Sequence, residues 1–254
     1  MEGRLVADII SEMAKRDGLK ILEQQHLRSH LANFNQFLDG LGFCLSEEGD
    51  LLSQWRGYAD DAMGVSIGFS KSYLQALAES FRENLKYRFS LNQVEYELEE
   101  QKSLLQPTYK KIKDSINKGA LKLTPPTVLT ENRTEKQKQL ENANFKNLYL
   151  DYSVKLLLLT ENLYLLKTKA FSEEKEWRLL SNFFKHNGSL CSFRPSRDKI
   201  IPYRAFKLKE FNEEAIIEVK LGPKNLTPID VVQEMLRKYG FNGVLVSRSE
   251  ASYR

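Results

Sequence analysis

The sequence predicts an α+β fold, in which a mostly antiparallel sheet is combined with a helical N-terminal portion and a helical insertion. Three observations support this class. Apolar residues repeat with a helical period near the N-terminus, the same period returns between about residues 71 and 168, and the period shifts toward two in the C-terminal third. Because 254 residues with 41% hydrophobic positions suffice for a full core, we expect one domain over residues 1–254, with the insertion at about 71–168.

The first forty residues are expected to be helical. One helix face would carry Leu5, Ile9, Ile10 and Met13, and after a break at Asp17-Gly18 a second would carry Leu27, Leu31, Phe34 and Leu38. A short buried strand over 41–46, a short helix around Trp55 and a strand over 65–69 follow.

The helical period resumes at Lys71 and runs through the insertion. We expect a strand over 89–96, a helix over 97–118 with a flaw at Pro107, and a helix over 145–166. The segment 124–127, with two prolines, is the best candidate boundary, and the polar stretch 132–142 behind it is either a solvated helix start or a mobile loop.

The C-terminal third is expected to be mostly sheet, with strands over 177–183, 200–207, 215–221 and 243–247. A helix before the last strand is signalled by Thr227 as its cap, Pro228 in its first turn and Gly240 as its stop. The sheet would then be built from the segments near residues 43, 67, 178, 203, 217 and 245.

Composition limits the classes of function. The net charge of +4 is small and spread along the chain, which permits a phosphate-bearing ligand without demanding DNA or RNA. The two cysteines, Cys44 and Cys191, lie too far apart for a metal spacing and predict a reducing compartment. No secretory pattern opens the sequence, and its pure apolar runs fall far short of the roughly 20 residues of a membrane span. We therefore expect a cytoplasmic protein that is not bound to a membrane.

The segment 51–61, Leu-Leu-Ser-Gln-Trp-Arg-Gly-Tyr-Ala-Asp-Asp, combines two aromatic residues, a cation and two carboxylates directly before a strand. We interpret it as one wall of a ligand site, with Trp55, Arg56 and Tyr58 as binding residues. In the competing interpretation, Trp55 and Tyr58 belong to the core and Arg56 forms a surface ion pair with Asp60.

A second cluster, Glu174-Lys175-Glu176-Trp177-Arg178, opens the C-terminal sheet. On a strand, Glu174 and Glu176 would point to the same face and could converge on one ligand. Near a sugar, one carboxylate could stabilise positive charge at the anomeric carbon while the other orients the nucleophile. A charged strand edge that keeps neighbours from pairing is the alternative.

Other chemistries find little support. The three histidines are too scattered to form a ligand set, so we expect no metal. The serines have no nucleophile-elbow glycines around them, which argues against serine hydrolysis, and a metal-dependent nuclease ranks a distant third. At the C-terminus, Arg248 and Arg254 could close the site over a phosphate, or the segment could be a frayed tail.

Several blocks, taken in order, resemble the bacterial domain-of-unknown-function 2971 family: Phe43-Cys44-Leu45-Ser46, Leu52 to Asp60, Gly64 to Phe69, Glu174 to Arg178, and Val246-Ser247 with Tyr253-Arg254. The resemblance covers most of the chain, and the tryptophan-to-glycine block is its more specific part. Domains of that family usually begin with a strand carrying a His-Tyr-Thr-like motif, which this sequence does not contain. The resemblance therefore leads us to expect that the chain is truncated, either naturally or by a choice of start site.

The motif order of that family is in turn similar to the ADP-ribosyltransferase plan. This resemblance implies that Tyr58 or Trp55 stacks on the nicotinamide ring of NAD and that Arg56 pairs with a diphosphate oxygen. Glu176 would hold the nicotinamide ribose and stabilise an oxocarbenium-like transition state, with Glu174 placing the acceptor. The early histidine or arginine of the plan is missing, which places NAD binding in question.

Two hypotheses of different classes follow. The first is an enzyme that transfers or hydrolyses the ADP-ribosyl part of NAD, as a bacterial toxin or phage-defence effector. The second is a noncatalytic module that binds nucleotide, RNA or a partner protein through the same pocket. The sequence does not specify the acceptor, which would be a protein or a nucleic acid. It does not specify the oligomeric state either.

Overall fold

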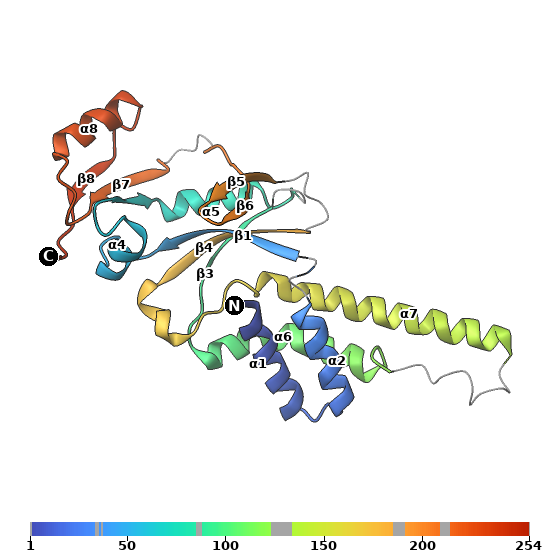
Figure 1. Ribbon diagram of the computed structural model, residues 1–254. Helices are drawn as coiled ribbons and strands as arrows, with labels where there is room; N and C mark the ends of the chain where they lie inside the picture. Colours follow the sequence, from blue (N-terminus) through green and yellow to red (C-terminus); the bar gives the residue numbers. More distant parts are fainter. Residues whose placement is uncertain are drawn as a thin grey trace. The chain divides into compact units, whose positions relative to one another are not determined.

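The structure, a computed structural model, describes residues 2–33, 36, 38–84, 88–122, 134–184, 191–208 and 214–253. The chain divides into two compact units (Figure 1). Unit 1 comprises residues 1–39, 95–169 and 184–186, and unit 2 comprises residues 40–94, 170–183 and 187–254.

Unit 1 is built from helices. They are α1 (Glu2–Arg16), α2 (Ile21–Ala32), α6 (Leu98–Asn117) and α7 (Glu135–Leu157), followed by the short 3-10 helix η2 (Leu158–Glu161). Helix α1 packs on α2 and α6, and α6 packs on α7. Helix α1 thus contacts both its neighbour in the sequence, α2, and the distant α6.

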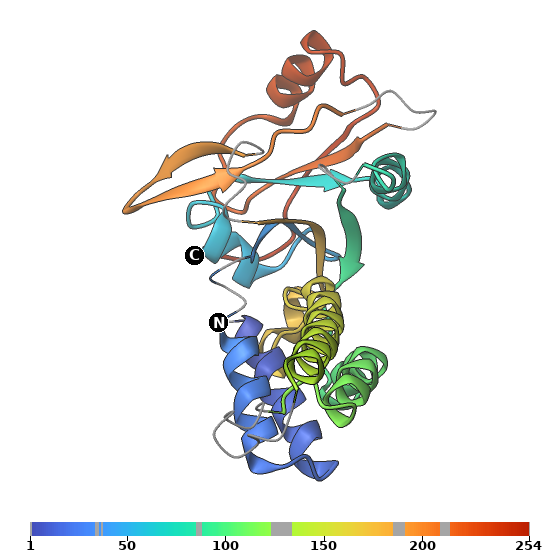
Figure 2. The ribbon, with the colours of Figure 1, turned by 90° about the vertical axis from the view of Figure 1, so that its right-hand side faces the viewer.

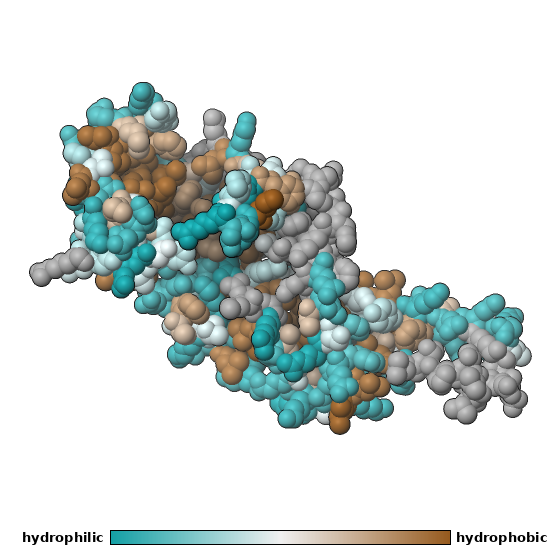
Figure 3. Space-filling view, in the orientation of Figure 1, coloured by the Kyte–Doolittle hydropathy of each residue, from teal (hydrophilic) through white to brown (hydrophobic). Residues whose placement is uncertain are grey.

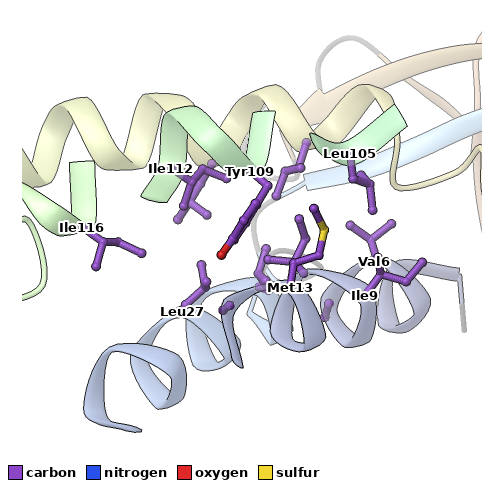
Figure 4. Close-up of a cluster of buried hydrophobic side chains, with 14 of the residues drawn as sticks. Val6, Ile9, Met13, Leu27, Leu105, Tyr109, Ile112 and Ile116 are labelled. Carbon is purple, nitrogen blue, oxygen red and sulfur yellow. The ribbon is translucent and has the colours of Figure 1, made fainter. Parts of the chain in front are cut away.

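A single hydrophobic core fills unit 1. Figure 4 shows Val6, Ile9 and Met13 of α1 facing Leu105 and Tyr109 of α6, and all five side chains are buried. Other core residues come from further turns of α1 and α6, from α2, from the end of α7, from η2 and from the segments next to these helices. Pro107 lies inside α6 and does not end it. Burial of the α6 stripe outweighs the loss of one helical hydrogen bond at this proline.

Unit 2 carries the sheets. β1 (Leu38–Ser46), β4 (Glu176–Phe184) and β3 (Ser90–Gln93) form one sheet in the order β1-β4-β3. β2 (Val65–Phe69), β7 (Ile216–Leu221) and β8 (Leu245–Arg248) form a second in the order β2-β7-β8. In the second sheet β2 and β7 are antiparallel, whereas β7 and β8 are parallel.

The remaining elements of unit 2 surround these sheets. β5 (Ser192–Ser196) and β6 (Lys199–Tyr203) form a two-stranded antiparallel ribbon, which projects from the other strands in Figure 2. The helices are α4 (Leu52–Tyr58), α5 (Lys71–Ser80) and α8 (Ile229–Lys238), with the 3-10 helix η3 (Lys169–Glu174) directly before β4. One small core lies between α5 and β3, and another lies between β7, β8 and α8.

The α+β class is confirmed, and all six segments expected to build the sheet are strands. They are distributed over three sheets instead of one. The prediction of one domain with an insertion at about 71–168 stays a prediction.

Some boundaries differ from those expected. Leu38 begins β1 instead of extending a helix. The helix predicted over 145–166 is α7, which spans Glu135–Leu157. Pro228 occupies the cap position of α8 instead of its first turn. Thr134 and Gln137 form a capping box at the start of α7, which explains its early beginning. The candidate boundary at 124–127 lies outside the described residues.

Among the described residues, no helix combines the length and the apolar character that a membrane crossing requires.

Candidate functional site

Glu174 and Glu176 do not share a strand. Glu174 is the last residue of η3, Glu176 is the first residue of β4, and Lys175 between them has a positive φ of 40°. The left-handed backbone at Lys175 redirects the chain, so the alternation of a regular strand does not extend to Glu174. The backbone carbonyl of Glu174 accepts a hydrogen bond of 2.8 Å from the Ser46 hydroxyl, which ties the end of η3 to β1.

Glu176 instead shares a strand face with Arg178. The Arg178 guanidinium donates through Nε and one terminal nitrogen to the two carboxylate oxygens of Glu176, at 2.7 and 2.9 Å. Both residues are buried, with exposed fractions of 6% and 5%. This two-pronged geometry is the strongest form of an Arg–carboxylate contact. Both oxygens of the Glu176 carboxylate are therefore hydrogen-bonded to a residue of the same strand.

Trp55 is buried at the centre of α4, with 2% of its surface exposed. Its indole nitrogen donates to Asp50 over 2.7 Å, and the same carboxylate accepts bonds from the Ser249 hydroxyl and the Glu250 backbone amide. Burial raises the pKa of Asp50, but these three donors outweigh it, so the pKa lies below its usual value. Asp50 therefore fixes the Trp55 ring to the segment that follows β8.

Arg56 and Tyr58 are exposed, and only Tyr58 lines the pocket described below. The Arg56 guanidinium lies 5.8 Å from the centre of the Tyr253 ring, and Lys224 lies 3.9 Å from the same centre. The Tyr253 hydroxyl donates to Asp61 over 2.5 Å, and this bond, together with that from Lys224, lowers the pKa of the Asp61 carboxyl. Arg56 thus belongs to a cluster around the C-terminal segment.

The Arg248 side chain is hydrogen-bonded to backbone carbonyl groups. Its guanidinium donates to the carbonyl oxygens of Asn225 and Thr227, each over 2.6 Å, and so holds the turn that precedes α8. Arg254 lies outside the described residues.

Unit 2 contains a pocket of about 890 Å³. Its wall is formed by the end of β1 and the turn after it, by one side of α4, by β2 and by the start of α5, with one residue each from β3 and β4 and two from β7. Of the residues expected in the site, Trp55 and Tyr58 line this pocket. Glu174, Glu176, Arg56 and Arg248 are not part of its lining.

The pocket meets two strands at their edges. Every residue of β2 lines it, as does the run Phe43–Ser46 of β1. Successive side chains of a strand point to opposite faces, so an unbroken run of lining residues means that the strand borders the pocket along its length. Both strands are edge strands, β1 of the first sheet and β2 of the second.

Much of the pocket wall is apolar and open to solvent. Phe43, Val65, Ile67 and Ile217 are each between 43% and 48% exposed. In the face of unit 2 that Figure 3 shows, hydrophobic side chains reach the surface between hydrophilic ones. Exposed apolar residues gathered in a concave site are typical of a ligand-binding surface.

Trp177 and three glutamates make polar contacts in the pocket. The indole nitrogen of Trp177 donates to Glu47 over 2.8 Å, and the Lys71 ammonium lies over its ring at 3.9 Å from the centre. Glu48 pairs with Lys175 at 2.5 Å. Glu218 accepts a bond from the Ser247 hydroxyl and pairs with Lys220 at 3.6 Å. The ion pair with Glu48 raises the pKa of Lys175.

Carboxylates outnumber ammonium groups in the lining of the pocket. The lining includes the carboxylates of Glu47, Glu48 and Glu218 and the ammonium group of Lys71. Glu48 and Glu218 each have a lysine partner outside the lining, Lys175 and Lys220. The excess of carboxylates within the lining itself favours a cation over a diphosphate, and the two lysine partners weaken this preference. The described residues contain no group of three His, Cys, Asp or Glu side chains placed to hold a metal ion.

Sequence reasoning missed most of the polar residues of the pocket. Trp177 was not among the expected site residues, and Glu47, Lys71 and Glu218 were not singled out. One signal was available for Glu218, a charged residue inside the apolar strand Ile216–Leu221. No local pattern predicted that β1 and β2 would face the same pocket.

Comparison with known proteins gives one match. No curated protein and no solved structure matches the chain. Residues 54–179 match a family described as "Protein of unknown function (DUF2971)". This range runs from α4 into β4 and includes Trp55, Arg56, Tyr58, Glu174 and Glu176, whereas Phe43 and Arg248 lie outside it. Over residues 54–179 the chain is therefore similar to the family of proteins of unknown function DUF2971.

Proposed function

We propose that unit 2 is a binding module whose pocket holds a positively charged partner, and that Glu176 serves the structure of β4 instead of catalysis. The observation that carries this proposal is the pocket itself: three carboxylates and exposed apolar side chains line it, and the expected Glu174 and Glu176 pair does not. Of the partners considered for a noncatalytic module, a protein suits this lining better than a nucleotide or RNA, whose phosphates the carboxylates repel.

Cys44 provides a direct test, because it is exposed and lines the pocket. A polarity-sensitive fluorophore would be attached to Cys44 in a Cys191→Ser background. We expect 1-methylnicotinamide and trilysine, both cations, to shift its emission, and AMP to leave it unchanged. The Glu218→Gln variant should weaken both responses. Equal responses to AMP and the cations, or none to the cations, would overturn the proposal.

A second candidate is the ADP-ribosyltransferase or NAD glycohydrolase, acting as a toxin or phage-defence effector. One observation favours it: the nicotinamide ring of NAD is a flat cation, and Trp177 with Glu47 offers an aromatic face beside a carboxylate. Glu218 or Glu47 would then face the reacting sugar from the pocket wall. NAD would be the substrate, with no metal required.

Nicotinamide release from NAD separates the two candidates. The binding module predicts no release by the wild type. If the wild type releases nicotinamide and either Glu218→Gln or Glu47→Gln abolishes the release, the protein is an enzyme whose catalytic carboxylate lines the pocket. Release lost in Glu176→Gln, in a variant that binds 1-methylnicotinamide normally, would return the catalytic role to Glu176.

A further inference from the structure

The pocket lies beside the edges of two strands. β1 and β2 are edge strands of different sheets; β2 borders the pocket along its whole length, and β1 borders it over Phe43–Ser46. The rings of Phe43 and Phe69 meet at 5.6 Å between their centres, so the two strands approach each other at that point. Away from this contact the pocket separates them.

The register of β2 shows which of its main-chain groups point toward this gap. The Gly222 amide donates to the Gly64 carbonyl over 3.0 Å, and Val65 pairs with Leu221. In an antiparallel pair, residues that exchange hydrogen bonds alternate with residues that do not. Ser66 therefore bonds to β7, while the amides and carbonyls of Val65 and Ile67 point away from β7, on the outer edge of the sheet.

The volume of the gap matches a strand of the length of β2. A strand residue occupies roughly 160 Å³, from a rise of about 3.3 Å, a strand spacing of about 4.8 Å and a sheet thickness of about 10 Å. A pocket of about 890 Å³ thus accommodates about five to six residues of extended chain. β2 itself has five residues.

β2 carries none of the charged or proline residues that protect many edges, although its register with β7 shifts between Gly68 and Phe69 at its end. Natural edge strands often carry lysine, proline or inward-pointing charges that prevent pairing. The sequence of β2 is Val-Ser-Ile-Gly-Phe, and its Val65 and Ile67 side chains are 43% and 48% exposed. An unprotected edge with apolar, solvent-exposed side chains is suited to accept another strand.

We propose that β2 binds an extended segment of a partner polypeptide as an added strand, and that this segment carries lysine or arginine beside apolar residues. The outward main-chain groups of Val65 and Ile67 provide the backbone bonds, and Glu47 and Glu218 attract the basic side chains. The added strand lies between β2 and β1 and so joins the two sheets. This inference rests on the proposed binding role of the pocket and specifies its partner.

The test begins with selection of binders from a random dodecapeptide library on the purified full chain. The sequences enriched should alternate apolar residues with lysine or arginine. A synthetic peptide of the consensus should bind, and replacing its basic residues by norleucine should weaken binding at least tenfold. The variants Glu47→Gln and Glu218→Gln should each weaken it in the same direction.

Main-chain recognition is tested by Ile67→Pro, which removes an outward amide and leaves the bonds to β7 in place. Its matched control is Ile67→Ala, which shortens the side chain and keeps the amide. We expect Ile67→Pro to bind the peptide at least tenfold more weakly than Ile67→Ala. If Ile67→Pro fails to fold, peptides N-methylated at alternate residues replace it, and only one of the two methylation registers should abolish binding.

Other occupants give other results. A homodimer that Ile67→Pro dissociates would assign the gap to a second copy of the chain and overturn the proposal. Peptides that bind Ile67→Pro and Ile67→Ala equally, or no enriched sequence, would also overturn it. In either case a response of the Cys44 probe to 1-methylnicotinamide would leave the binding role of the pocket standing.

Discussion

The carboxylate of Glu176 and the guanidinium of Arg178 are joined by two hydrogen bonds, and both groups are buried on the same face of β4. Removing one member takes two hydrogen bonds from the charge that stays buried, which costs far more than the pair contributes as a whole. The pair is therefore the part of the expected site with the clearest effect on stability.

We predict that Glu176→Ala lowers the free energy of unfolding by about 3–5 kcal/mol. The physical reason is the loss of both hydrogen bonds between Glu176 and the buried Arg178 guanidinium. Denaturant unfolding measures the loss, with Glu173→Ala, an exposed neighbour, as a control that should change stability by about 0.5 kcal/mol or less. The double variant Glu176→Met with Arg178→Leu should recover much of the stability, because no charge remains buried. A double variant as unstable as Glu176→Ala would contradict this account.

Asp50→Ala should destabilise the protein by about 1–3 kcal/mol, because the buried indole N–H of Trp55 loses its acceptor. The pKa of Asp50 is lowered in the folded protein, so its ionised form stabilises the fold above the ordinary value of about 3.8, and this contribution is lost as the pH falls through the folded pKa. Unfolding measured between pH 7 and pH 3 should therefore show wild type and variant converging at the acid end. Parallel curves would exclude this role of Asp50.

His30 introduces a second dependence on pH, in unit 1. Burial first, and the neighbouring His26 second, lower the pKa of His30 below its ordinary 6.5. The unfolded chain then binds the proton at a higher pH than the folded chain, so stability is full above about 6.5 and falls as the pH decreases. The Nδ1 atom of His30 lies 3.0 Å from the Tyr152 hydroxyl, which links α2 to α7. Thermal unfolding of His30→Gln should show a smaller loss between pH 7.5 and pH 5.5 than the wild type. A loss of equal size would show that His30 does not titrate in this way.

Gly222 and Gly57 form a matched pair for backbone packing. A Cβ atom on Gly222 would lie 2.3 Å from the carbonyl oxygen of Ala62, whereas one on Gly57 meets nothing within 4 Å. Gly222→Ala should therefore cost about 2 kcal/mol or more, because backbone must move. Gly57→Ala, inside α4, should be neutral or stabilising by up to about 1 kcal/mol. Denaturant unfolding compares the two, and equal effects would contradict the close approach at Gly222.

The sequence predicted the elements of unit 2 better than their arrangement. Val65 to Phe69 and Ile216 to Leu221 lie within segments predicted as strands, because their apolar side chains and flanking breaks are local signals. Their grouping into separate sheets depends on contacts between distant segments, such as the Phe43 and Phe69 rings, which no local pattern encodes. The predicted start of α7 was wrong because the cap at Thr134 sets it, and the apolar period does not reveal that cap.

The candidate site shows the same limit. Trp55 and Tyr58 were found because a mixed aromatic and charged helix is locally unusual, and both line the pocket. Glu174 and Glu176 were grouped on the assumption of a continuous strand, which the positive φ of Lys175 interrupts. A left-handed residue other than glycine, asparagine or aspartate gives little warning in a sequence. Glu218 and Trp177 reach the pocket through sheet pairing, which depends on the whole fold.

The two tryptophans of the chain report on the pocket separately. Trp55 is 2% exposed, whereas Trp177 is half-buried and lines the pocket with its ring under Lys71. Acrylamide should therefore quench the emission of the wild type in part, through Trp177. In Trp177→Phe, whose remaining tryptophan is Trp55, quenching should fall several-fold, and in Trp55→Phe it should rise as a fraction of the signal. A partner strand in the gap between β1 and β2 should protect Trp177 and leave Trp55 unchanged. Quenching dominated by Trp55 would mean that α4 opens in solution, and the wall of the pocket would then have to form when the partner binds.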